Sequence, residues 1–455
     1  MLFVACVVLS ALAGCARDVA GEARVPNSFY FPVDVAAPAG GGRFAYVLSA
    51  NLDHRYNTGW ISVIDLEKAL GADAEPEVAI SDGVDVPSLG ASLHIRANDG
   101  FLMSTGRGYR SVNVVWPQIN QAGDGVSFRC VGSSEPCSEA TRVLISADDV
   151  GNDARTQDLL SPFSGVFIDL KQEGVLKHYA ALAYLGSSFL SLFEVGTDGV
   201  FRHVRSALLG NVAVNNLALH PATCGNTRAF LVAGSQPFVS NTQSQMIHVD
   251  VDRFLQGKSD AINSTELQSA VGSFSVASSA FAPAANDDCA LGNQWLYLAS
   301  AGAGDAANIT VLDAALTNTL VGNVDTPDPY DTRILERPNY DIASALPVGG
   351  RLGKTLYIRR DGGDILAVAA FDDDAVYFLS VKDASVQLIT RYEEGIGRGP
   401  YGLAETSYNG KRYLLVPSFV DHSVSIIDID GRDPARFKTV ARVYNPKTPP
   451  TERRP

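Results

Sequence analysis

Charged, aromatic and imidazole side chains recur in short polar segments, each of which follows an aromatic-rich apolar stretch. The segment NLDHRYNTG at 51–59 is the richest, and shorter ones lie at 106–110, 371–374 and 419–423. A guanidinium binds a carboxylate through two hydrogen bonds, and an aromatic ring offers a stacking surface. The candidate binding residues are therefore Asp53, His54, Arg55, Tyr56, Arg107, Tyr109, Arg110, Asp373, Asp421 and His422.

The same residue types also have an ordinary structural use. Loops are polar in most proteins, and Asn51 and Asp53 belong to the types that cap turns. His54 and His422 fall in the first and last of these segments, so a chain that closes into a ring would bring them together as an acid–base or metal site. We keep both the binding role and the structural role open for these segments.

Metal-binding and catalytic motifs are scarce. Carboxylates gather at Asp372-Asp373-Asp374 and at 146–155 (SADDVGNDAR), and carboxylate oxygens suit Ca²⁺. Consecutive side chains on an extended strand point to opposite sides, however, and the second segment lacks the spacing of an EF-hand. The sequence contains no CxxCH, CxxC, HExxH, GxSxG or Walker A motif. We assign no catalytic residue, no metal and no cofactor, and keep calcium as an alternative.

The polar segments lie between elements that repeat along the chain. Each copy has a small-apolar strand, a Gly or Asn turn, an aromatic-rich strand, a polar loop and a strand ending near Val-x-Asp. The four clearest copies lie at 31–66, 211–252, 271–313 and 397–429, and weaker copies at 84–116, 161–195 and 337–386.

Seven copies of this kind predict an all-β protein. Alternation in Phe44-Tyr46-Leu48 and Ile61-Val63-Asp65 is typical of half-buried antiparallel strands. One four-stranded sheet cannot bury both its faces, whereas sheets packed radially around an axis bury each other. We expect a β-propeller of about seven four-stranded blades over 31–445, with two β-sandwiches as the alternative. Inserts at 117–160 and 315–340 leave the blade count open by one.

A propeller places the loops between the second and third strands of all blades on one face. The candidate binding residues lie in these loops, so we expect them to surround one mouth of the central channel.

The pair of motifs YVLSAN and VIDL resembles the YVTN and YncE-like repeats of exported bacterial propellers, over about 25–445. The resemblance implies a seven-bladed, WD40-like propeller. It leaves the function open, because propellers carry many unrelated activities. Lactonases and quinoprotein dehydrogenases are among the enzymes that use such folds.

The N-terminus indicates export. Residues 1–14 are uncharged and too few to span a bilayer as a helix, which favours a signal peptide. Leu12-Ala13-Gly14-Cys15 resembles the bacterial lipobox, which implies a lipid on Cys15; an ordinary signal peptide is the alternative. Ala16 favours the outer membrane, with the protein on its periplasmic or cell-surface side. Residues 15–30 form the anchor and linker, and 446–455 a disordered tail.

Four further cysteines suit an exported chain, in which an even number favours disulfides. Cys130 and Cys137 flank a short polar loop and form the natural local pair. Cys224 and Cys289 each precede a strand in successive repeats. Three pairings are possible, and the sequence does not choose between them.

Charge narrows the possible partners. Lys and Arg number 36 against 50 Asp and Glu, which gives a net charge of −14. A nucleic-acid binder needs clustered cations, so we exclude that class. We predict a lipid-anchored, non-enzymatic binding or scaffold protein of the cell envelope, whose loop face takes a protein, peptide or glycan partner. The alternative is a lactonase or quinoprotein-dehydrogenase type of enzyme with its site at the channel mouth.

The lipid anchor is directly testable. Cys15→Ser removes the only sulfur that the lipobox offers, so the variant is expected to move from the membrane fraction to the soluble fraction. Sedimentation of cell envelopes followed by immunoblotting measures this. Unchanged pelleting of the variant would count against the anchor.

Overall fold

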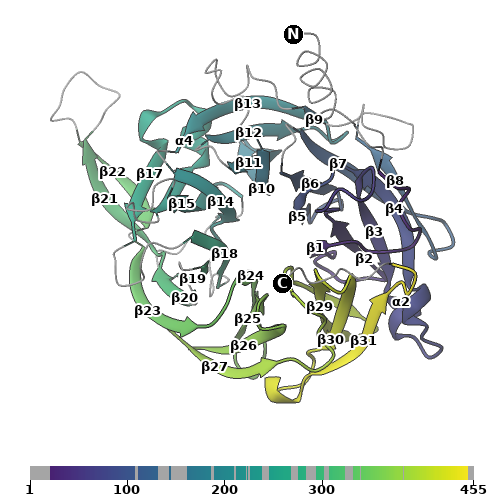
Figure 1. Cartoon of the computed structure of the whole chain (residues 1–455). Helices are drawn as coiled ribbons and strands as arrows, with labels where there is room; N and C mark the ends of the chain where they lie inside the picture. The colour runs from purple at the N-terminus through teal and green to yellow at the C-terminus, as the bar shows by residue number, and fades with distance from the viewer. Residues whose placement is uncertain are drawn as a thin grey trace, which may run out of the picture.

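Seven β-sheets stand like blades around a central channel (Figure 1). The computed structural model describes residues 21–448 with these exceptions: 108–110, 132–142, 145–160, 186–188, 210–211, 222, 224–225, 238–244, 268–274, 283–293, 302–306, 323–331, 339 and 383.

Each blade is an antiparallel sheet of four strands, and the first strand in sequence lies nearest the channel (Figure 1). Blade 1 comprises β1 (Pro32–Ala36), β2 (Phe44–Ser49), β3 (Gly59–Asp65) and β4 (Ile80–Val86), and blade 2 comprises β5 (Gly90–Ile95), β6 (Leu102–Gly106), β7 (Ser111–Ile119) and β8 (Val126–Cys130). Blade 3 comprises β10 (Ser161–Gln172), β11 (Val175–Leu185), β12 (Phe189–Val195) and β13 (Phe201–Leu208). Blade 4 comprises β14 (Val212–Leu219), β15 (Phe230–Pro237), β16 (Gln245–Asp250) and β17 (Ile262–Glu266). Blade 5 comprises β18 (Ser275–Phe281), β19 (Trp295–Ala301), β20 (Ala307–Asp313) and β23 (Asp341–Val348). Blade 6 comprises β24 (Leu352–Ile358), β25 (Ile365–Ala370), β26 (Ala375–Lys382) and β27 (Ser385–Tyr392). Blade 7 comprises β28 (Ala404–Tyr408), β29 (Lys411–Ser418), β30 (Ser423–Asp428) and β31 (Lys438–Tyr444).

Few elements lie outside this pattern. A short strand, β9 (Val143–Leu144), pairs with β7, and a hairpin of β21 (Leu316–Gly322) and β22 (Thr332–Pro338) interrupts blade 5. The short helices are α2 (Leu66–Leu70), α4 (Val251–Leu255), η1 (Pro76–Val78), η3 (Ser259–Ala261) and η5 (Pro434–Arg436). No helix among the described residues is long and apolar enough to cross a membrane.

The seven-bladed propeller is the fold predicted from the sequence, and it excludes the alternative of two β-sandwiches. Blade 5 departs from the expected boundaries: 341–348 was expected in the sixth repeat, but this segment pairs with β20 as the outer strand of blade 5. The reason is the hairpin β21–β22, which lengthens the connection before that strand.

The middle strands are buried on both faces, which differs from the half-buried strands expected. All residues of β2 are buried. Phe44 and Tyr46 pack with Leu93 and other residues of blade 2, whereas Ala45 and Val47 pack in a cluster with blade 7. Both faces of β2 are therefore covered by neighbouring blades, with its larger side chains towards blade 2 and its smaller ones towards blade 7.

A ring of polar residues joins the innermost strands. In six blades the pairing of the first strand with the second contains a bulge, and a polar residue sits at or just after it. In blade 7 an isolated bridge at Pro400 precedes the equivalent position, which is a glycine. We call these the waist residues: Asp34, Ser92, Ser164, Asn216, Ser278, Lys354 and Gly402.

The waist residues bond from blade to blade. The Asp34 carboxylate accepts the Leu93 N–H of blade 2 at 2.9 Å. The Ser92 hydroxyl lies 3.2 Å from the Phe163 carbonyl of blade 3. The remaining links are Leu217 N–H to Ser164 Oγ at 3.1 Å, Asn216 Nδ2 to Ser279 Oγ, Ser278 Oγ to Gly353 O at 2.8 Å and Lys354 N–H to Tyr401 O at 2.7 Å.

Glycine at position 402 lets Lys354 reach over blade 7. The Lys354 ammonium donates to Asp34 Oδ1 at 2.8 Å, so blade 6 is bonded to blade 1. A Cβ at position 402 would lie 2.9 Å from Asp34 Cα and 3.0 Å from Asp34 Oδ1. The missing side chain therefore leaves room for this ion pair.

His422 secures the junction between the last and first blades. No strand is shared between them, because blades 1 and 7 are each complete in consecutive strands. The buried His422 Nδ1 accepts the Phe31 N–H at 2.9 Å, and its ring stacks on Tyr30 with 4.6 Å between centroids. Asn445 adds two hydrogen bonds to the carbonyls of Pro26 and Asn27.

The waist can be tested at Gly402. Gly402→Ala is expected to lower the free energy of unfolding by about 1–3 kcal/mol, because the added methyl group meets backbone atoms of Asp34. Urea unfolding followed by tryptophan fluorescence measures it. Gly431→Ala is the matched control, since a Cβ there meets no atom within 4 Å. Equal stabilities of the two variants would contradict the packing described.

The junction predicts a pH dependence. Burial lowers the pKa of His422 to about 4, whereas an unfolded chain has about 6.5. The unfolded state therefore binds more protons between these values, and stability falls as the pH falls from 6.5 to 4. His422→Asn keeps an acceptor but does not titrate.

From pH 7 to pH 4, wild type is expected to lose roughly 3 kcal/mol more unfolding free energy than His422→Asn. Urea unfolding at several pH values checks this. Identical pH profiles would show that His422 does not carry the effect.

Candidate functional site

Three connected cavities occupy the channel. We call the face with the loops between second and third strands the loop face. The mouth cavity at that face has a volume of about 320 Å³, the waist cavity about 590 Å³ and the opposite-face cavity about 650 Å³. Arg107 and Tyr401 line both the mouth and the waist, and His94 and Lys354 line both the waist and the opposite face.

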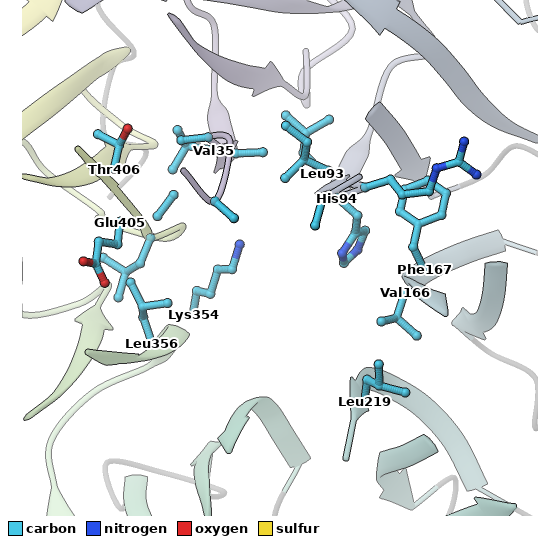
Figure 2. Close-up of a pocket in the computed structure, with 18 of the residues that line it drawn as sticks. Val35, Leu93, His94, Val166, Phe167, Leu219, Lys354, Leu356, Glu405 and Thr406 are labelled. Carbon is cyan, nitrogen blue, oxygen red and sulfur yellow. The ribbon is translucent and has the colours of Figure 1, made fainter. Parts of the chain in front are cut away.

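The opposite-face cavity is largely apolar (Figure 2). Leu93, Val166, Leu219 and Leu356 lie around the opening in this view, and the Lys354 ammonium projects into it. Glu405 is the acidic residue labelled there, and its carboxylate accepts from the Arg412 guanidinium at 2.7 Å. Two cations line this end of the channel, and both are paired: Lys354 with Asp34 and Arg96 with Asp99.

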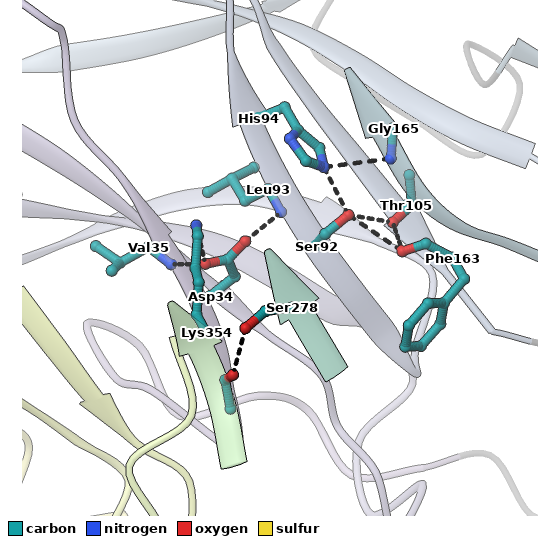
Figure 3. Close-up of polar contacts among 11 residues, drawn as sticks. Asp34, Val35, Ser92, Leu93, His94, Thr105, Phe163, Gly165, Ser278 and Lys354 are labelled. Carbon is teal, nitrogen blue, oxygen red and sulfur yellow. Dashed lines mark hydrogen bonds and ion pairs between the residues drawn. The ribbon is translucent and has the colours of Figure 1, made fainter. Parts of the chain in front are cut away.

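The waist cavity is polar, but its groups bond mainly to one another (Figure 3). His94 Nε2 lies 2.8 Å from Ser92 Oγ and accepts the Gly165 N–H at 3.4 Å. Burial lowers the pKa of His94 to about 4, so its imidazole is neutral near pH 7. Because Nε2 acts as an acceptor, the ring proton belongs on Nδ1.

The mouth cavity combines guanidinium groups with aromatic rings. Arg107 stacks over Phe163 of the next blade, with 4.7 Å from its guanidinium carbon to the ring centroid. No described carboxylate forms an ion pair with Arg107. Arg351, by contrast, donates to Asp372 and stacks over Phe371 at 4.5 Å. The apolar part of the wall is formed by Val33, Ala50, Leu52, Leu89, Leu352, Phe371, Tyr401 and Phe419.

The predicted β2–β3 loop lies on the loop face, but its side chains bond locally. Asp53 accepts the Tyr30 hydroxyl at 2.7 Å, and Arg55 pairs with Glu22 at 3.2 Å. Tyr56 is buried and packs edge-on against Trp60. His54 is exposed with a positive φ of 55°. His54 and His422 do not bond to each other; Tyr30 contacts His422 and Asp53 between them.

The predicted residues of blades 6 and 7 are also held by neighbours. Asp373 accepts the Tyr377 hydroxyl and lies 3.5 Å from Arg391. Asp421 accepts from both Arg398 and Arg442, and although burial opposes it, these bonds lower its pKa. Of the eight candidate residues that the structure describes, Arg107 is the one that lines these cavities.

Other predictions fall partly outside the described residues. Tyr109, Arg110, Cys15, Cys137, Cys224 and Cys289, and the acidic segment at 146–155, lie there. Cys130 is disulfide-bonded, and its partner stays a prediction. Within the described residues no three His, Cys, Asp or Glu side chains converge as a metal site. Asp372 binds Arg351, whereas Asp374 accepts the Gly399 N–H at 2.8 Å.

Sequence reasoning missed the waist residues and most of the mouth wall. A signal was present: Pro32-Val33-Asp34, Pro162-Phe163-Ser164 and Pro400-Tyr401-Gly402 place the waist position two residues after a proline. The two serines Ser92 and Ser278 have no such proline. Aromatic mouth residues such as Phe371 and Phe419 begin the predicted loops but read as the ends of apolar strands.

Comparison with known proteins agrees with this fold. The periplasmic gluconolactonase PpgL of Pseudomonas aeruginosa superimposes with a TM-score of 0.51 at 12% identity, over 88% of this chain and 96% of that one. A putative 6-phosphogluconolactonase from Bacteroides fragilis gives 0.47 at 11% identity, over 91% and 94%. No protein-family model and no curated protein sequence matches. At such identity the likeness concerns the fold alone: the chain is a seven-bladed β-propeller.

Proposed function

We propose that this protein is an exported, lipid-anchored binding protein whose mouth cavity takes a small anionic molecule with an apolar body. The supporting observation is Arg107. Its side chain is exposed to the channel, lies over Phe163 and forms no ion pair with a described carboxylate. A ligand carboxylate, sulfonate or phosphate would supply that partner.

The surrounding wall favours an apolar body on the same ligand. Phe371, Tyr401 and Phe419 come from blades 6 and 7 and face the same cavity as Arg107 of blade 2. Aromatic rings give large contact areas and lose little conformational entropy on binding. A cavity of about 320 Å³ suits a small molecule or the end of a longer one.

The location rests on the sequence. The lipobox at Cys15 supports attachment to the outer membrane, and the disulfide at Cys130 agrees with an oxidising compartment. The sequence predicts a protein, peptide or glycan partner at the loop face. Such a partner is compatible with this site if one anionic group of the partner enters the mouth cavity.

A hydrolase is the second candidate, favoured by the 2.8 Å contact between Ser92 Oγ and His94 Nε2 in the waist cavity. Its rank is lower because the pKa of His94, lowered to about 4, makes it a weak base. Asp34, the nearest waist carboxylate, is bonded to Leu93 N–H and Lys354. The lactonase-like form of this idea predicts hydrolysis of a sugar lactone such as gluconolactone.

The binding proposal is tested with anilinonaphthalene sulfonate, an anion with an apolar ring system that fluoresces when bound. We expect one site per chain. Arg107→Met keeps the side-chain length but removes the charge, so its affinity is expected to fall at least about tenfold. Fluorescence titration of the soluble Cys15→Ser form measures it.

The matched control is Arg391→Met. Arg391 lies on the same face, pairs with Asp373 and does not line the mouth cavity. Equal affinities for both variants and the parent would contradict the site. Turnover of gluconolactone that Ser92→Ala abolishes would replace the binding assignment with the hydrolase.

A further inference from the structure

The N-terminal end of the described chain lies on the loop face. The Glu22 N–H donates to Arg55 O at 2.8 Å, and Asn57 N–H donates back to Glu22 O at 3.3 Å. Both partners belong to the β2–β3 loop. A Cβ at Gly21 would lie 2.5 Å from the Tyr56 backbone, so this segment lies directly against that loop.

Chain length limits how far this face can stand from the membrane. Gly21 lies six positions after Cys15, and six extended residues span about 20 Å. A lipid anchor at Cys15 would therefore hold the loop face, which contains the mouth cavity, within about 20 Å of the bilayer surface. The opposite face lies at the far end of the channel.

Polarity changes with depth in the mouth. Arg107 lines both the mouth and the waist, so it lies deep. Leu52 and the rings of Phe371 and Phe419 line the mouth cavity but not the waist, and Leu52 is 44% exposed. A ligand that enters with its charged group first thus leaves its apolar part against the outer wall, on the membrane side.

We infer that the mouth faces the membrane and takes a single-chain anionic amphiphile from it, with the carboxylate at Arg107 and the alkyl chain against Leu52, Phe371 and Phe419. This rests on the proposed function, which it narrows to one ligand class and one source. Arg351 lies at the same cavity but is already bonded to Asp372, which leaves Arg107 as the anchor for the anion.

The ligand class is tested by measuring how strongly each candidate ligand displaces anilinonaphthalene sulfonate from the Cys15→Ser protein. Dodecanoate is expected to bind at least about tenfold more tightly than acetate, which has the carboxylate without the chain, because chain burial adds free energy. Dodecanol, which has the chain without the charge, is expected to bind more weakly than dodecanoate. In Arg107→Met the advantage of dodecanoate over dodecanol is expected to disappear.

Orientation is tested with the lipidated protein in vesicles of phosphatidylcholine and phosphatidylglycerol that carry nitroxide headgroups. A fluorophore on Leu52→Cys reports the loop face. The same fluorophore on Lys171→Cys, an exposed residue near the end of β10, reports the opposite face. We expect strong quenching of the first and little of the second.

The outcomes separate the two proposals. Binding of dodecanoate with equal quenching at both positions would overturn the membrane orientation and leave the binding function intact. Quenching at Leu52→Cys with no preference for dodecanoate over acetate would overturn the ligand class. Failure of both anilinonaphthalene sulfonate and dodecanoate to bind would overturn the proposed function itself.

Discussion

The waist ring of hydrogen bonds is the constraint on which the rest of the structure depends. Six of the seven innermost strands have a bulge with a polar residue at it, and in blades 1, 2, 3 and 5 the side chain of that residue meets a backbone group of the next blade. Such groups would be costly to bury unpaired, so each blade fixes the angle of its neighbour. Gly402 is the exception that completes the ring, because only an absent side chain lets Lys354 reach Asp34 across blade 7.

This ring also bears on the proposed binding site. The polar groups of the waist already bond to one another, so the middle of the channel offers few free partners despite its polarity. Arg107 differs because its guanidinium lies over Phe163 and forms no ion pair with a described carboxylate. Arg107 lines both the mouth and the waist, but Phe371 and Phe419 line the mouth alone, so among the described residues the mouth adds two aromatic rings to this guanidinium.

The fold was more predictable than the site. Alternating strands such as Phe44-Tyr46-Leu48 repeat along the chain, and the repeat placed every loop between second and third strands correctly where the structure describes it. Side-chain roles in those loops did not follow. Asp421 lies between two arginines, Tyr56 is buried, and His422 accepts a backbone N–H from blade 1. The arginines of Asp421 lie 23 and 21 positions away and Phe31 lies 391 positions from His422, outside the loops themselves, so loop composition alone did not indicate them.

The sequence by itself determined the all-β repeat and the acidic charge and gave the blade count to within one, because strand periodicity and composition are local properties that each copy carries. The resemblance to a lipobox at Cys15, which stays a prediction, is of the same local kind. Only the tertiary structure decided which of the described polar residues bond to one another inside the propeller. Closing seven blades into a ring brings Asp34 to Lys354 and Phe31 to His422, and contacts between residues more than three hundred positions apart depend on that closure rather than on neighbouring residues.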